Sequence, residues 1–330
     1  MNEFLDAVEL FIGVVNGLKK KQINLSSSLD EIVLKACGTN LAYVDNRRNA
    51  KEEFNFDFWD SIKKQFRNSE SFLNWIKSYS IDERFLYSKS EQFPDFLLKV
   101  KKHDNKLICG SLLELKDSKG GSIASFNSTL PTKYKSLDEV DIINGNNLVS
   151  RITSIMDGKL ASDQNYHTFQ RRNFYFIRTH KDDDDKVRIS IVDGSFFETV
   201  SKEHLINQML LNILQGHLEK KGINISPEIL NEVEKSISYV TDQTIIAASQ
   251  NIEKASIRPR LRIMAEVHPE GNPHGSFYPE ISERSVNLII QSSPYKEKII
   301  KTISKKIPDV DVFSIKHKRN GDHTVFQIKF

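Results

Sequence analysis

The residues of this sequence best suited to chemistry are two acids and a lysine. Asp95 directly follows Pro94, and Glu114 and Lys116 come further along the chain. Two carboxylates that meet offer the hard oxygen ligands that Mg²⁺ takes together with water and phosphate oxygens. An ammonium group beside such an ion can orient a water molecule and stabilise phosphate charge. This combination indicates hydrolysis of a phosphodiester bond.

The spacing of acid and lysine alone is not specific. Acid-x-Lys triplets begin at six positions, namely Asp104, Glu114, Asp117, Asp157, Asp184 and Glu219. Glu114 differs because it lies within the apolar segment 112–115, where a charged group is costly unless a partner compensates it. The same alternation also fits a strand with one solvent-exposed face that carries Glu114 and Lys116 as ordinary surface residues. Both interpretations remain open.

A predicted hairpin positions these residues. The segments 93–100 and 107–116 are short and apolar, and the polar residues 103–106 between them predict a turn, so the two strands are expected to pair antiparallel. Asp95 and Glu114 then lie on neighbouring strands. Lys116 projects from the same face as Glu114 because side chains alternate along a strand.

The remaining patterns predict a mixed α/β protein. The first 80 or so residues are helical in pattern, the segments 173–178 and 187–192 predict a second strand pair, and 201–221 predict a helix that ends at Gly222. After a boundary near 222–226 we expect a smaller α+β unit. Its predicted elements are a helix from Pro227, strands at 261–267 and 286–291, a helix at 294–306 and a hairpin of 310–316 with 324–330. The predicted domains are therefore 1–222 and 223–330.

The motif Pro94-Asp95 with Glu114-Leu115-Lys116 resembles that of the PD-(D/E)xK nucleases. The following segments 116–119 and 126–131 are similar to type II restriction endonucleases, and the resemblance covers roughly residues 57–200. It implies a restriction-endonuclease-like mixed sheet flanked by helices, one or two Mg²⁺ ions per active site, double-stranded DNA as substrate, and a homodimer.

The resemblance also implies roles for individual residues. Asp95 and Glu114 would hold Mg²⁺, the backbone carbonyl of Leu115 would complete the site, and Lys116 would serve the attacking water. Some members of the family add an acid from the preceding helix. The candidates here are Glu70, Glu83 and Glu91, and nothing in the sequence chooses among them.

Basic and polar residues in several segments are candidates for DNA contact. Residues 94–135 carry a local charge of +4 and residues 294–330 of +5, within a chain of net charge +3, which suits a polyanionic partner. The candidates are Lys119, Ser125, Asn127, Arg171, Arg172, Arg258, Arg260, Arg262, Lys318 and Arg319. For each of them, an ordinary surface or loop position is the alternative.

Composition excludes several other classes of protein. The chain has 330 residues, of which 38% are hydrophobic and 28% charged, which is ordinary for a folded protein. Two cysteines are too few for a disulfide framework or a zinc cluster. No apolar run is long enough for a membrane span, no signal sequence is visible, and a cytoplasmic setting is expected. Since Walker, Gly-x-Gly-x-x-Gly and Gly-x-Ser-x-Gly motifs are absent, no nucleotide cofactor or serine-hydrolase activity is expected.

The sequence therefore predicts a Mg²⁺-dependent, sequence-specific endonuclease that cleaves double-stranded DNA, of the type II restriction class. Three alternatives remain. The first is a repair or junction-resolving nuclease of the same fold. The second is a DNA-binding protein without catalysis, and the third is a protein-interaction module in which Glu114 and Lys116 merely pair on a strand surface.

Overall fold

The chain divides into two compact units in the computed structural model. The described residues are 2–37, 41–45, 85–89, 93–98, 111–118, 131–144, 168, 170–180, 187–198, 202–240, 244–245, 247–248, 273 and 275–330. Unit 1 consists of Met1–Ser125, Pro131–Glu198 and Met264–Phe330, and unit 2 consists of Phe126–Leu130 and Thr199–Ile263.

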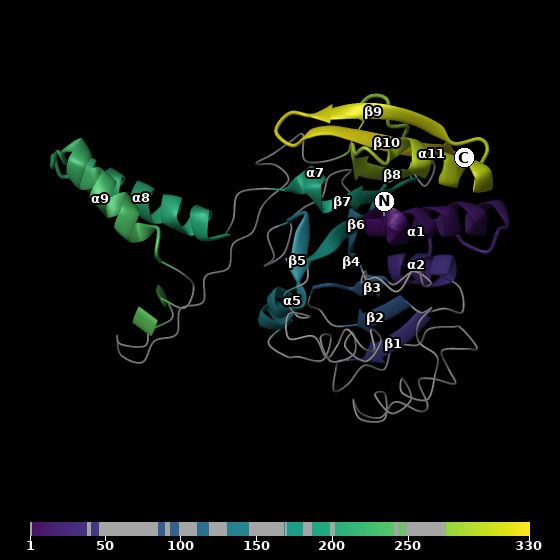
Figure 1. Ribbon diagram of the computed structural model, residues 1–330, viewed down its shortest axis with the longest axis horizontal. Helices are drawn as coiled ribbons and strands as arrows, with labels where there is room; N and C mark the ends of the chain where they lie inside the picture. Colours follow the sequence, from purple (N-terminus) through teal and green to yellow (C-terminus); the bar gives the residue numbers. More distant parts are fainter. Residues whose placement is uncertain are drawn as a thin grey trace. The chain divides into compact units, whose positions relative to one another are not determined.

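The strands of unit 1 form a mixed sheet (Figure 1). They are β1 (Leu41–Asp45), β2 (Phe85–Lys89), β3 (Phe96–Leu98), β4 (Ser111–Ser118), β5 (Tyr134–Ser136), β6 (Gln170–His180), β7 (Val187–Asp193), β8 (Ser285–Gln291), β9 (Asp311–His317) and β10 (Gly321–Lys329). The order across the sheet is β1-β2-β3-β4-β6-β7-β8-β10-β9, and β5 also pairs with β6. The β4–β6 and β7–β8 pairs are parallel, whereas β3–β4, β6–β7, β8–β10 and β9–β10 are antiparallel.

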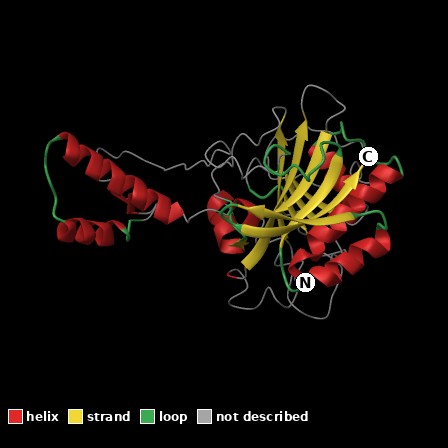
Figure 2. Cartoon of the chain, turned by 90° about the horizontal axis from the view of Figure 1, so that it is seen from above, coloured by secondary structure: helices red, strands yellow, loops and turns green. Residues whose placement is uncertain are grey.

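Helices flank the sheet. Those of unit 1 are α1 (Asn2–Lys19), α2 (Leu29–Cys37), α5 (Leu137–Asn144), α7 (Gly194–Phe197) and α11 (Lys296–Lys306). Helices α1, α2 and α11 share one hydrophobic core with alternate residues of the central strands, and Figure 2 shows helices along one side of the twisted sheet. The predicted fold class, a mixed sheet flanked by helices, is confirmed at this level. None of the helices in the described ranges is long and apolar enough to cross a membrane.

The two faces of the sheet differ in what covers them. Leu113, Phe174 and Phe326 point into the core under α1, α2 and α11. Side chains alternate along each strand, so Tyr175 points to the opposite face, where Phe197 of α7 packs against it with ring centroids 5.2 Å apart. We call this second face the α7 face.

Several predicted elements are confirmed. The hairpin of 93–100 with 107–116 appears as the antiparallel pair β3–β4, and the second strand pair appears as β6–β7. The last hairpin forms as β9–β10 around Asn320-Gly321, where Gly321 has a φ of +75° that favours glycine. Part of the helical pattern predicted for the first 80 or so residues lies outside the described residues, as does the strand predicted at 261–267.

The division into units differs from the predicted boundary at residue 222. Strand β8 pairs in parallel with β7, with Ile191 opposite Leu288, so the C-terminal strands complete the sheet of unit 1. The predicted boundary lies instead in the turn between two helices of unit 2, α8 (Lys202–Lys220) and α9 (Pro227–Ile237). Strand pairing across nearly a hundred residues leaves no local pattern, so the sequence could not show it.

Unit 2 contains a helical hairpin whose ends follow their sequence signals. Gly222, with a φ of +67°, follows the end of α8 as the left-handed residue that commonly terminates a helix. Ser226 caps α9 by accepting a hydrogen bond from the N–H of Ile229, and Pro227 occupies the first helical position.

Candidate functional site

The register of β3 and β4 brings the two predicted acids together. Phe96 pairs with Leu113 and Leu97 with Leu112, so that one step further along the same register Asp95 lies opposite Glu114. Opposed residues on neighbouring strands share a face. Oδ2 of Asp95 accepts a hydrogen bond from the N–H of Leu115 at 2.8 Å, which fixes this carboxyl against the backbone of β4.

Glu114 and Lys116 form an ion pair within this site. Nζ of Lys116 lies 2.7 Å from Oε1 of Glu114, and each side chain is only 14% exposed. Oε2 of Glu114 is buried and has no hydrogen-bond partner among the described residues. An ordinary solvent-exposed pair would be more exposed and would leave that oxygen to water. The arrangement therefore disfavours the surface-pair interpretation and leaves one carboxylate oxygen available to a ligand.

The environment of both carboxyls opposes negative charge. Burial raises the pKa of Asp95 well above its ordinary value, and the neighbouring Glu114 carboxylate adds to the shift, although Leu115 N–H and Lys116 oppose it. Burial likewise raises the pKa of Glu114, although Lys116 and Asp95 oppose that shift. Two partly buried carboxylates that face one ammonium group favour a shared proton or an additional cation.

We expect Asp95→Asn to stabilise the protein near neutral pH when divalent cations are removed. A raised folded-state pKa means that the folded protein binds the proton more tightly than the unfolded chain. The stability of the pair is therefore present below the ordinary values of 3.8 and 4.5 and is lost as pH rises through the folded-state pKa values. The amide oxygen of Asn can still accept the hydrogen bond from the N–H of Leu115. Removal of the buried negative charge should increase the free energy of unfolding by about 1 kcal/mol, which raises Tm by about 2–4 °C.

Thermal unfolding in EDTA between about pH 4 and pH 8 measures this effect. The difference in Tm between Asp95→Asn and the wild type should be largest at the highest pH and should vanish at the lowest pH. Asp322→Asn, which changes an exposed acid of β10, should show no such trend. An Asp95→Asn variant that is less stable than the wild type throughout the alkaline range would contradict the expectation.

A further acid, Asp30, acts on this site. It lies in the first turn of α2, and its negative charge also contributes to the raised pKa of Asp95. The sequence analysis missed it, and the three candidates Glu70, Glu83 and Glu91 lie outside the described residues. An acid in the first turn of a helix is expected from the helix dipole alone, so its type and position give no signal of a site.

Tyr175 is a second residue of the site that sequence analysis missed. It pairs with Glu114 across the parallel β4–β6 register and is almost fully buried. Burial raises its pKa, and the Glu114 carboxylate adds to that shift, so the phenol stays protonated in the working range of the protein. A neutral, buried ring therefore lies next to Glu114 on its β6 side.

The residues present fit a magnesium ion. Within the described ranges, no three His, Cys, Asp or Glu side chains are grouped as a metal-binding cluster. Mg²⁺ does not need such a cluster, since it is commonly bound through one or two carboxylates and keeps several waters. The backbone carbonyl of Leu115 lies on the same edge of β4 as its N–H, which points to Asp95. Asp95, Glu114 and this carbonyl thus form a donor set of oxygen atoms, with Oε2 of Glu114 available.

The predicted DNA contacts have mixed outcomes. Lys119, Ser125, Asn127, Arg258, Arg260 and Arg262 lie outside the described residues. Lys318 and Arg319 are exposed on the turn between β9 and β10. Arg171 and Arg172 are buried, with exposed fractions of 5% and 3%, and therefore do not present a surface to DNA.

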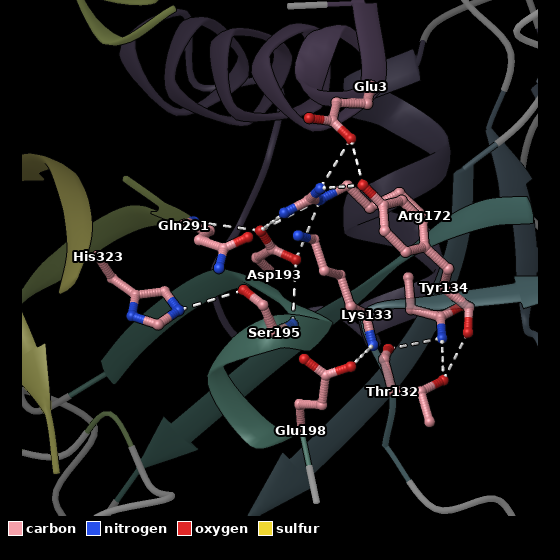
Figure 3. Close-up of polar contacts among 11 residues, drawn as sticks. Glu3, Thr132, Lys133, Tyr134, Arg172, Asp193, Ser195, Glu198, Gln291 and His323 are labelled. Atoms are coloured by element: carbon pink, nitrogen blue, oxygen red, sulfur yellow. Dashed lines mark hydrogen bonds and ion pairs between the residues drawn. The ribbon is translucent and has the colours of Figure 1, made fainter. Parts of the chain in front are cut away.

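Arg172 instead binds the buried Asp193 and two partly exposed residues, Glu3 and Tyr134 (Figure 3). Its Nε and Nη2 contact the carboxylate of Asp193, and its Nη1 donates to Glu3 at 2.8 Å and to the hydroxyl of Tyr134 at 2.9 Å. Its guanidinium also stacks over the ring of Phe4, 4.2 Å from the centroid. The DNA-binding interpretation of Arg172 is thereby corrected to an internal ion pair that joins α1, β5, β6 and β7.

Ser195, His323 and Asp193 lie close together but do not form a catalytic triad (Figure 3). Oγ of Ser195 is 3.2 Å from Nε2 of His323, yet Nδ1 of His323 lies 3.2 Å from the carbonyl of Gly321 and not against a carboxylate. Asp193 accepts instead from Arg172 and from the backbone N–H groups of residues 195 and 291. Both Ser195 and His323 are buried, so the group serves to hold α7 on the sheet.

Comparisons of the chain with protein-family models, with curated proteins and with solved structures found no match. The resemblance to the PD-(D/E)xK nucleases therefore rests on Asp95, Glu114 and Lys116 and on the strands that carry them.

Proposed function

We propose that this protein hydrolyses phosphodiester bonds of double-stranded DNA with the help of Mg²⁺. One observation carries the proposal. The partly buried carboxyls of Asp95 and Glu114 lie opposite each other at the end of the β3–β4 pairing, with the Lys116 ammonium group beside them and one oxygen of Glu114 without a hydrogen-bond partner among the described residues. Such a group binds a hard cation and a phosphate together.

Each residue has a role in this proposal. Asp95 and Glu114, with the Leu115 carbonyl, hold the ion, which when bound polarises the phosphate and lowers the pKa of nearby water. Leu115 N–H keeps Asp95 oriented. Lys116 is held near Oε1 of Glu114, where its ammonium group can orient the attacking water and stabilise the charge that develops on the phosphate. Tyr175 excludes water from the β6 side.

The finer assignment is a type II restriction enzyme that acts as a homodimer on palindromic sites. It is supported only by the resemblance to these enzymes, which covers roughly residues 57–200. A two-fold dimer would match the symmetry of such a site.

The test is digestion of unmethylated phage DNA by the purified full-length protein, with Mg²⁺ or with EDTA, followed by sequencing of the ends. Discrete fragments with defined ends that form only with Mg²⁺ are the expected result. Metal-dependent cutting at branched or damaged DNA without discrete fragments would replace the restriction assignment by a repair or junction nuclease. Binding of DNA without cleavage under any of these conditions would contradict the proposal.

A further inference from the structure

The turn between β9 and β10 is fastened to α7 by side-chain and backbone hydrogen bonds. Nδ1 of His317 accepts from the backbone N–H groups of Arg319 at 3.2 Å and of Asn320 at 3.0 Å. Nδ2 of Asn320 donates to the carbonyls of Phe196 at 2.7 Å and of Glu198 at 3.1 Å. The first pair of bonds fixes the shape of the turn, and the second fixes its position on α7.

An aromatic contact supports the same turn from below. The ring of Phe196 packs edge-on against His317 and His323, with centroids 4.9 and 5.1 Å apart. His323 in turn contacts Oγ of Ser195 and the carbonyl of Gly321, each at 3.2 Å. Both ends of the turn are therefore attached to α7. We call residues 317–321 the anchored turn.

The anchored turn holds two cations in solvent on a fixed backbone. Lys318 and Arg319 are exposed, whereas His317 beneath them is buried. A surface hairpin needs no such anchoring for its own stability, since Asn-Gly alone makes a good turn. Anchoring reduces the conformational entropy that a ligand must overcome on binding, so it favours contact with an anion.

The anchored turn lies on the same sheet face as the acid pair. Paired residues share a face, and the β4–β6, β6–β7, β7–β8 and β8–β10 registers connect Glu114 through Tyr175, Val192 and Ile289 to Val325. His323 is two residues from Val325 and so also lies on the α7 face. Phe197 of α7 packs on Tyr175, which pairs with Glu114. Four strand spacings separate β4 from β10, roughly 19 Å at 4.8 Å each.

We propose that the anchored turn is a second contact point for the DNA backbone, in which Lys318 and Arg319 bind phosphates of the same duplex whose scissile bond lies at Asp95 and Glu114. This inference rests on the proposed function. The turn also lies four residues beyond Val325 along β10, roughly 13 Å at 3.3 Å per residue, so the acid pair and the turn are roughly 23 Å apart, about seven base pairs along a duplex whose turn is about 34 Å. His317 and Asn320 are positioning residues that hold the two cations in place.

Helix α11 offers a matched control. Lys301 and Lys305 are also exposed and also lie in the basic C-terminal segment, but α11 packs on the opposite face of the sheet. Substitution of either pair by alanine removes the same charge from the protein. A purely nonspecific effect of net charge would therefore change both variants equally.

The experiment compares Lys318→Ala/Arg319→Ala with Lys301→Ala/Lys305→Ala in the full chain. Fluorescence anisotropy with a labelled duplex of about 30 bp in EDTA gives the affinity between about 50 and 200 mM salt. Each phosphate contact contributes about 0.9 to the slope of log K against log salt, so loss of two contacts lowers the slope by about 1.8 in the turn variant alone. An equal change in both variants, or none in the turn variant, would overturn the proposal.

Asn320→Ala tests the positioning role without a change of charge. It should weaken duplex binding and lower the salt slope while the β10 strand and the thermal unfolding of the protein remain close to wild type. Wild-type binding by this variant would exclude the positioning role. Because binding in EDTA is independent of cleavage, a protein that binds through the turn but never cuts would contradict only the nuclease proposal. A protein that cleaves DNA, but whose turn variant has the same salt dependence of binding as the wild type, would contradict only the proposal on the anchored turn.

Discussion

Glu114→Gln is expected to reduce Mg²⁺-dependent cleavage of DNA by at least about 10²–10³-fold. The amide keeps the shape of the side chain and can still contact Lys116, but it removes the negative charge and the available carboxylate oxygen that the ion requires. Initial rates of plasmid cleavage over a Mg²⁺ titration measure the effect. Duplex binding in EDTA should be retained or increase, since one negative charge facing the phosphate is lost.

The control for this variant is Glu219→Gln. Glu219 also begins an acid-x-Lys triplet, with Lys221, but it is exposed on α8. The Glu219→Gln variant should cleave DNA at the wild-type rate. Mg²⁺ should also raise the Tm of the wild type and of Glu219→Gln, but not that of Glu114→Gln, because a ligand stabilises only the state that binds it. Undiminished cleavage by Glu114→Gln would remove the acid pair from the mechanism.

Arg172→Met should destabilise the protein by about 3–5 kcal/mol, the largest effect on stability that we expect from a single substitution. The side chains of Arg172 and Asp193 are 2% and 0% exposed, so removal of the guanidinium leaves a buried carboxylate without its cation. Glu3 and the hydroxyl of Tyr134 lose a donor at the same time. The free energy of unfolding in urea, measured near neutral pH, gives the effect.

Two further variants test whether the uncompensated buried charge causes this loss of stability. Arg172→Met/Asp193→Leu should recover part of the loss, because the uncompensated charge disappears with its partner. Lys301→Ala on the exposed face of α11 should change the free energy of unfolding by less than about 0.5 kcal/mol. If Arg172→Met were as mild as Lys301→Ala, the internal ion pair would not stabilise the fold.

The β3–β4 hairpin was predictable because its signals are local. Two apolar runs and a polar turn lie within about 25 residues, and such contacts leave a period-two pattern in the sequence. The same holds for the β9–β10 hairpin with its Asn320-Gly321 turn and for the Gly222 and Ser226 signals at the ends of helices. In each case the residue that determines the conformation is adjacent to the element it shapes.

The sequence predicted that Asp95 and Glu114 lie on neighbouring strands, whereas the register that places them opposite each other, and the other residues near them, came from the structure. The charge of Asp30 on α2 adds to the raised pKa of Asp95, and Tyr175 of β6 pairs with Glu114. Each belongs to an element far away along the chain. Chain folding alone brings them together, so neither residue type nor spacing could indicate them.

Arg172 shows the opposite case, in which sequence reasoning assigned a plausible role that burial excludes. An arginine before a strand is usually exposed and suits phosphate. Its pairing with Asp193 depends on the β6–β7 register, and its contact with Glu3 depends on the docking of α1. Burial and pairing are properties of the packed structure, and the identity of the residue does not reveal them.

The mixed α/β class, the two hairpins and the pair of acids with its lysine could be predicted from the sequence, because each depends on residues that are near neighbours in the chain. Only the folded structure shows that strands β8–β10 complete the first sheet, that Arg172 is internal, and that the turn carrying Lys318 and Arg319 is attached to α7. These three facts depend on pairing and packing between segments that are separated by about 20 to 170 residues along the chain. Such contacts are selected by the burial of whole faces, for which no short segment of sequence carries the information.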